Sequence, residues 1–208
     1  MRRALNLFNA LIDSSENAKN IYIYMHGITP LIDSTDLLRW QWVQAVSALD
    51  KFIHDIVRIG MIEIFNGQRS STAKYNNFMI NLETLNQIIS STDIVERTQI
   101  IEQQIFHQNG YKSFQSPSSI SDALAYIWDD NHKWQTISSK MLGTPEANDV
   151  KTQLNNIILR RNQIVHEGDC LSDTVPLERQ IIEDEDVDST ITFIKDLTKS
   201  IYDCIAIV

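Results

Sequence analysis

The residues best suited to chemistry lie in one segment of the C-terminal third, IILRRNQIVHEGD, residues 157–169. On a helix that turns by about 100° per residue, Arg161 points along a stripe of aliphatic side chains. The stripe consists of Leu154, Ile157, Ile158, Ile164 and Val165. A guanidinium keeps its proton, so this position is costly unless an anion accompanies it. His166, five residues on, is the side-chain type that titrates near neutrality. The pair predicts a site for a phosphate.

Three neighbouring residues are candidates for supporting roles. Arg160 also precedes His166 at a suitable spacing, so the sequence leaves open which arginine belongs to the site. Asn162 lies on the same helix face as His166, four residues away, where it could orient the imidazole or hold a phosphate. Glu167 follows His166 directly.

Asp50 is the carboxylate that we expect to pair with Arg161, because it also lies along an apolar stripe, that of an earlier helix. Such a pair could be purely structural, or it could hold the guanidinium in a catalytic pose. Structural interpretations of the whole segment stay open as well. His166 could stabilise the carbonyl end of its helix, and Arg161 could be a structural arginine paired with a buried carboxylate.

Helical periodicity dominates the chain, and no alternating run is long enough to build a sheet. We therefore expect an all-α bundle of about six to eight helices, with a long early helix and the motif helix in the core. The expected helices cover 3–12 and 16–25 (one or two helices), 34–65, 81–90, 93–108, 119–142, a segment ending at Gly168, and 188–207. Residues 1–34 are expected to be an N-terminal helical extension and 35–208 the main domain.

Composition excludes several classes of protein. The chain has 208 residues, 43% of them hydrophobic, enough for one domain with a real core, and no run approaches the roughly 18 apolar residues of a membrane helix. A net charge of −9 argues against broad nucleic-acid binding, so any nucleic acid would meet a small local site. We expect the acidic run 178–188 to be a solvated loop. Cys170 and Cys204 lack metal-ligand spacing and predict two free thiols in a reducing cytoplasm. No metal or cofactor is expected.

The segment from Arg161 to His166 resembles the active-site motif of the HEPN superfamily, small all-α domains that include many metal-independent ribonucleases of toxin–antitoxin, antiviral and RNA-processing systems. The family pattern is an arginine, four to six residues and a histidine, with a polar residue after the arginine, where this chain has Asn162. The sequence WVQAVSALDKFIHDIV, residues 42–57, is similar to the first core helix of the HEPN branch named for ribosomal L-PSP. The resemblance covers residues 35–207.

The resemblance implies an endoribonuclease. His166 would take the proton from a ribose 2′-OH or protonate the departing 5′-oxygen, and Arg161 would bind the non-bridging oxygens of the phosphate. The products would be a 2′,3′-cyclic phosphate and a 5′-OH. Family members dimerise so that two motifs face each other, so the expected partners are RNA, a second copy of this chain, and an antitoxin or defence-system protein. The alternatives are a HEPN-like module that binds a nucleotide or protein without catalysis, and an antitoxin-type component whose acidic face mimics nucleic acid.

Overall fold

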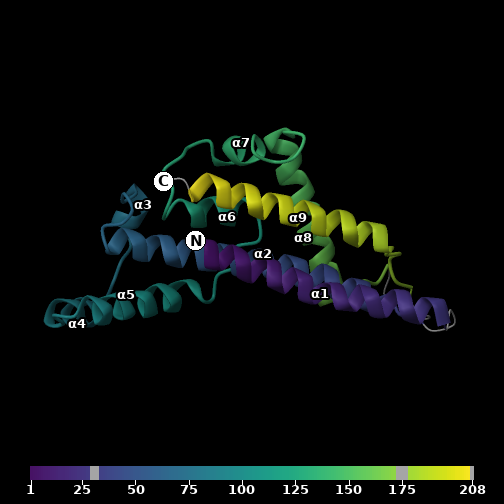
Figure 1. Cartoon of the computed structure of the whole chain (residues 1–208), viewed down its shortest axis with the longest axis horizontal. Coiled ribbons are helices and arrows are strands. Elements are labelled where there is room, and N and C mark those ends of the chain that lie inside the picture. The colour runs from purple at the N-terminus through teal and green to yellow at the C-terminus, as the bar shows by residue number, and fades with distance from the viewer. Residues whose placement is uncertain (29–32, 172–177, 207–208) are drawn as a thin grey trace.

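The computed structural model describes residues 1–28, 33–171 and 178–206, and every regular element in these ranges is a helix (Figure 1). The elements are α1 (Arg2–Ile28), α2 (Asp36–Phe65), α3 (Ala73–Asn76), α4 (Leu82–Ser90), α5 (Ile94–Asn109), α6 (Pro117–Leu124), α7 (Lys133–Ser138), α8 (Ala147–Glu167) and α9 (Asp184–Ile205). The all-α prediction is confirmed, with slightly more helices than expected because three of them are very short.

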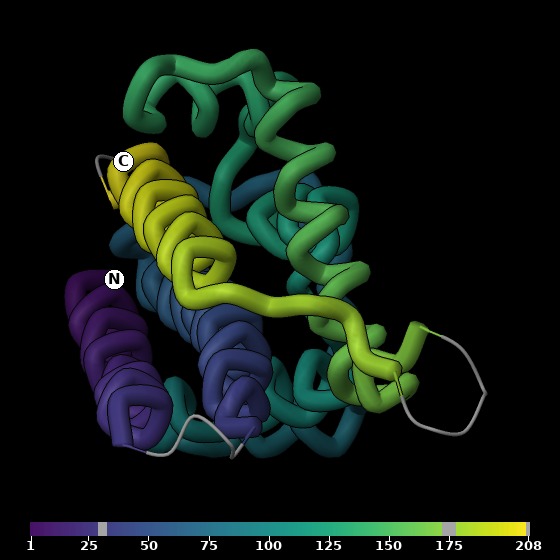
Figure 2. Tube along the Cα trace, turned by 90° about the vertical axis from the view of Figure 1, so that its right-hand side faces the viewer, coloured from purple at the N-terminus to yellow at the C-terminus, as the bar shows by residue number. Residues whose placement is uncertain are grey.

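The centre of the molecule is α2, which contacts α1, α5, α6, α8 and α9. The axes of the long helices α1, α2 and α9 are roughly parallel, with α1 running opposite to α2 and α9, whereas α8 runs steeply across them (Figures 1 and 2). The core between these helices is built from aliphatic and aromatic side chains, among them Phe8, Phe52, Ile53, Leu124 and Ile201. The prediction of a long early helix is confirmed by α2. The angle at which α8 crosses α2 determines which part of α2 the motif helix can contact.

Several helix ends follow from local sequence as predicted. Asp93 caps α5, its carboxylate accepting a hydrogen bond of 2.9 Å from the backbone N–H of Val95. After α2, Gly67 takes a φ of +71°, and after α8, Gly168 takes a φ of +61°. Glycine adopts this left-handed conformation without steric cost, so it ends helices readily. The end of the motif helix is therefore fixed one residue beyond Glu167.

The predicted helix over residues 119–142 is wrong. Ser116, not Ser119, caps α6, which ends at Leu124, and α7 begins only at Lys133. The interruption centres on Asp130, whose carboxylate accepts 2.6 Å and 2.7 Å hydrogen bonds from the His132 backbone N–H and the Thr136 hydroxyl. A short acidic side chain that binds nearby donors in this way competes with helical hydrogen bonding. In contrast, the region over 3–12 and 16–25 forms one continuous helix, α1.

The acidic run is not wholly a solvated loop, because its second half begins α9. Glu183 and Asp186 form a reciprocal capping box at the start of this helix, in which the Asp186 carboxylate accepts a 3.2 Å hydrogen bond from the backbone N–H of Glu183. Carboxylates in a first helical turn also interact favourably with the positive end of the helix dipole. The clustering of negative charge at 183–188 therefore stabilises a helix start.

The proposed boundary between residues 34 and 35 stays a prediction. Phe8 and Ile12 of α1 are fully buried in the same core as Phe52 of α2, and the rings of Phe8 and Phe52 lie 5.9 Å apart, centroid to centroid. The N-terminal helix thus contributes directly to the packing around α2.

Gly60 packs closely against the side chain of Ile127. A Cβ added there would lie 2.6 Å from Cγ2 and 2.9 Å from Cβ of Ile127, which is buried. We expect Gly60→Ala to lower the free energy of unfolding by on the order of 1–3 kcal/mol, measured by urea denaturation. The matched control is Gly27→Ala, where an added Cβ meets nothing within 4 Å, and which should raise stability by up to about 1 kcal/mol. Equal effects at both positions would contradict this packing argument.

Candidate functional site

The motif helix α8 is held against the bundle by its apolar face. Val150, Leu154 and Ile157 are buried, and the indole Nε1 of Trp42 donates a 3.1 Å hydrogen bond to the backbone carbonyl of Ile157. This contact joins α8 to the N-terminal part of α2. It sets the depth at which the following turns of α8, including Arg161, lie in the fold.

Arg161 lies half-buried on the side of α8 that faces the bundle. Its Nη1 donates a 2.9 Å hydrogen bond to Oδ1 of the neighbouring Asn162. Its Nε is buried without a hydrogen-bond partner, and the described part of the chain places no carboxylate within 4 Å of the guanidinium. A partly buried cation without an anionic partner is energetically unfavourable, which favours the binding of an anion.

His166 lies exposed on the opposite side of the last turn of α8. Five helical residues separate it from Arg161, which amounts to about 140° around the axis and about 7.5 Å along it. Asn162 contacts Arg161 rather than the imidazole, and Glu167 is exposed. A single copy of the helix therefore directs the guanidinium and the imidazole to different sides.

The expected pairing of Asp50 with Arg161 is wrong. The Asp50 carboxylate accepts a 2.5 Å hydrogen bond from the backbone N–H of Phe114, and its other oxygen lies 4.0 Å from Nε2 of His54. The reason is the crossing of the two helices. Because α8 meets α2 near Trp42, Asp50 lies about 12 Å further along α2.

Of the two arginines that fit the motif, Arg160 is the one that pairs with a buried carboxylate, that of Asp169. Oδ2 of Asp169, which is 0% exposed, lies 2.7 Å from Nε of Arg39 and 3.0 Å from Nη2 of Arg160. Arg160 also donates to the side chain of Gln180 and, at 3.1 Å, to the carbonyl of Ile181. Burial lowers the pKa of the Arg160 guanidinium and the charge of Asp169 opposes that effect. Arg160 thus has a structural role.

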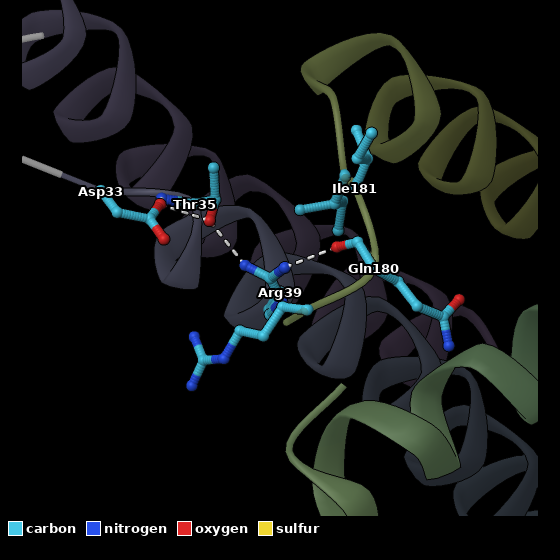
Figure 3. A pocket seen from close by; sticks show the side chains of 7 residues that line it. Asp33, Thr35, Arg39, Gln180 and Ile181 are labelled. Atoms are coloured by element: carbon cyan, nitrogen blue, oxygen red, sulfur yellow. Dashed lines mark hydrogen bonds between the residues drawn. The ribbon is translucent and has the colours of Figure 1, made fainter. Parts of the chain in front are cut away.

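The same cluster joins three segments that are distant in sequence. Arg39 donates to the Thr35 hydroxyl at 2.6 Å and to the carbonyl of Gln180 at 2.8 Å, as Figure 3 shows. The backbone N–H of Gln180 in turn donates to the carbonyl of Asp169 at 2.8 Å. A pocket of about 490 Å³ opens beside Arg39 and is also lined by Asp33, whose pKa is lowered by its hydrogen bonds from Thr35. Every nitrogen of the Arg39 guanidinium is already occupied, so this pocket lacks a free cation at that position.

Sequence reasoning missed Asp169 and Arg39. Asp169 adopts a φ of +62° directly after Gly168. Aspartate is among the few residues that tolerate this conformation, so an aspartate following a helix-ending glycine was the available local signal. No sequence signal singled out Arg39, which lies inside the long helix.

The chain matches a family model described as RiboL-PSP-HEPN over residues 3–206. The chain belongs to the RiboL-PSP-HEPN family. The match includes α1, so the relationship extends further towards the N-terminus than the resemblance at 35–207. No curated protein and no solved structure matches this HEPN domain.

Within the described ranges of this HEPN domain, no three His, Cys, Asp or Glu side chains are arranged to hold a metal ion. No helix in these ranges has the length and apolarity needed to cross a membrane.

The Asp169 cluster predicts a strong dependence of stability on one carboxylate. Asp169→Asn leaves two buried guanidinium groups without their anion, and we expect the free energy of unfolding to fall by about 3–5 kcal/mol in urea denaturation. The control is Asp122→Asn, because Asp122 forms an ion pair with Lys74 at the surface, where its side chain is 71% exposed. That loss should stay below about 1 kcal/mol. A small effect at Asp169 would show that the cluster does not stabilise the fold.

Proposed function

We propose that this RiboL-PSP-HEPN domain is a metal-independent endoribonuclease of the toxin or antiviral-defence kind, with Arg161 and His166 as its catalytic residues. The observation that carries the proposal is the state of Arg161, whose buried Nε has no partner and which has no carboxylate within 4 Å in the described chain. The neighbouring Arg160 is occupied by Asp169. Of the two arginines that fit the motif, Arg161 is therefore the one available to a phosphate.

In the proposed reaction His166 accepts the proton of a ribose 2′-OH, and the resulting oxygen attacks the adjacent phosphorus. The bond to the 5′-oxygen breaks, and that oxygen receives a proton, leaving a 2′,3′-cyclic phosphate and a 5′-OH. Arg161 offers its planar guanidinium to the non-bridging oxygens as negative charge builds on them. Asn162, through its hydrogen bond to Nη1 of Arg161, positions that guanidinium. Metal independence is inferred from the family resemblance.

The proposed working unit is a two-fold dimer in which the α8 helices approach each other near His166. One motif supplies one imidazole, whereas the reaction uses both a base and an acid. The exposure of His166 and its angular separation from Arg161 support a site completed by a second copy. Two-fold symmetry also brings two guanidinium groups to one cleft, which makes a local cationic site compatible with a net charge of −9.

A non-catalytic module is the second candidate, and the acidic net charge favours it. In that case the Arg161 site would bind a nucleotide or an acidic segment of a partner protein without cleavage. An antitoxin or another component of a defence system is the kind of partner that either function implies.

Alanine at Arg161 or His166 should reduce RNA cleavage at least a hundredfold while leaving the melting temperature nearly unchanged, because neither side chain makes an ion pair in the described structure. Arg161→Lys should also fail, since a point charge does not reproduce bidentate phosphate contact. His107→Ala, at another exposed histidine, is the matched control. Cleavage is measured on labelled RNA with the end groups identified. Full activity of His166→Ala would contradict the assignment, and activity that is abolished by EDTA would contradict the metal-free mechanism.

Mixing wild-type chains with an equal amount of His166→Ala chains tests the shared site. If one cleft needs the imidazoles of both copies, only the wild-type dimers, about a quarter of the total, stay active. If each copy works alone, about half of the activity remains. Light scattering should give about twice the chain mass of 23.9 kDa. A monomer that still cuts RNA would rule out the dimeric mechanism.

A further inference from the structure

A second pocket, of about 540 Å³, lies between α6 and the N-terminal half of α8. Its polar lining consists of Ser118, Ser121, Asn148, Lys151, Thr152 and Asn155. Trp134 adds an apolar surface to the same pocket. Its indole is 8% exposed and is fixed by a 3.1 Å hydrogen bond from Nε1 to the carbonyl of Pro117. The pocket therefore combines hydroxyl and amide groups with a rigid aromatic wall.

Lys151 is the lysine of the described chain that has no partner. The other lysines all form an ion pair or donate a hydrogen bond to an oxygen, as Lys140 does to the carbonyl of Asp203 at 2.8 Å. Those partnered lysines are Lys19, Lys51, Lys74, Lys112, Lys133, Lys140, Lys195 and Lys199. Lys151 is half-buried, and no carboxylate lines its pocket. On a chain with a net charge of −9, an unpaired lysine in an acid-free pocket provides a local site for an anion.

This pocket and His166 lie on one face of α8. Residues spaced alternately by four and three fall within about 80° of one direction on a helix. They are Asn148, Thr152, Asn155, Leu159, Asn162 and His166. All of them are exposed except the half-buried Asn162, and none is acidic. The face extends about 22 Å along the axis between the level of Lys151 and that of His166.

We propose that this pocket binds a nucleotide of the RNA strand that is cut at His166, a few nucleotides away from the cleaved bond. Lys151 binds a backbone phosphate, and the amides of Asn148 and Asn155 hydrogen-bond to a ribose or a base edge. Trp134 gives the base an apolar surface to pack against. The inference rests on the proposed function, because His166 defines where the strand is cut. It adds a subsite that binds RNA at the other end of the α8 face.

The negative charge of an RNA strand and the positive charge of Lys151 in the pocket favour RNA as the occupant. A single RNA strand carries a phosphate at every nucleotide, so a strand that leaves the cleavage site at His166 along α8 requires a second cation to keep it against an acidic protein. The face between the two sites carries uncharged polar groups and one exposed aliphatic residue, Leu159, which is 59% exposed. This path therefore places no negative side chain against the phosphates.

The test uses full-length protein carrying His166→Ala, so that RNA is bound without being cut. Fluorescence anisotropy measures the Kd of a labelled single-stranded oligonucleotide of about ten nucleotides at several salt concentrations. Adding Lys151→Met should weaken binding about tenfold and lower the slope of log Kd against log salt by about one unit. Asn155→Ala should weaken binding about threefold with little change in that slope. The matched control, Lys195→Met, removes a lysine of α9 that pairs with Glu16 and should leave the Kd unchanged.

The outcomes separate this inference from the proposed function. If Lys151→Met binds RNA as Lys195→Met does, the subsite is wrong, whereas cleavage by the wild-type protein would still support the ribonuclease. If the wild-type protein cuts no RNA but Lys151→Met weakens binding tenfold, the RNA subsite stands and the ribonuclease proposal fails. If Lys151→Met instead changes the mass measured by light scattering while the Kd stays the same, the pocket is a contact between copies and the subsite is wrong.

Discussion

The burial of the Asp169 carboxylate between two guanidinium groups fixes the end of the motif helix in this fold. A carboxylate that is 0% exposed is stable only with cationic partners, and these come from Arg39 on α2 and Arg160 on α8. Because Asp169 follows Gly168 in a left-handed conformation, the chain turns sharply and brings the carboxylate back beneath the helix that it has just left. The last turn of α8 is therefore held in place by the contacts of Asp169 with Arg39 and Arg160. His166 lies on the remaining, open side.

Because of this constraint, the two consecutive arginines Arg160 and Arg161 have different roles. Arg160 and Arg161 differ by about 100° around the helix, so they cannot reach the same partner. Asp169 lies on the side of Arg160 and satisfies it, which leaves Arg161 half-buried with only Asn162 as a hydrogen-bond partner within the described chain. The segment from Arg160 to His166 thus contains two arginines with different roles. Arg160 stabilises the helix end, and Arg161 stays available for an anion.

The sequence predicted what depends on local interactions and failed where helices meet. Asp93 begins α5 through its side-chain cap, and Gly67 and Gly168 end helices through a left-handed backbone conformation, so those ends could be predicted. The pairing of Asp50 could not, because a hydrophobic stripe gives the direction in which a side chain points but not the height at which another helix crosses. Asp130 shows the intermediate case, since its effect on the backbone is local but depends on a side-chain rotamer that the sequence does not specify. The site residues themselves stay predictions.

The position of the motif at a helix C-terminus explains why a second copy matters to the proposed mechanism. The carbonyl end of α8 carries partial negative charge, which opposes the binding of a phosphate. One guanidinium must then compensate both this dipole and the general acidity of a chain with a net charge of −9. In the proposed dimer, two copies related by a two-fold axis near His166 would supply two guanidinium groups and two imidazoles to one phosphate, so that one imidazole accepts a proton and the other donates one. The proposed subsite at Lys151 would hold another part of the strand, away from the carbonyl end of the helix and near its positive end.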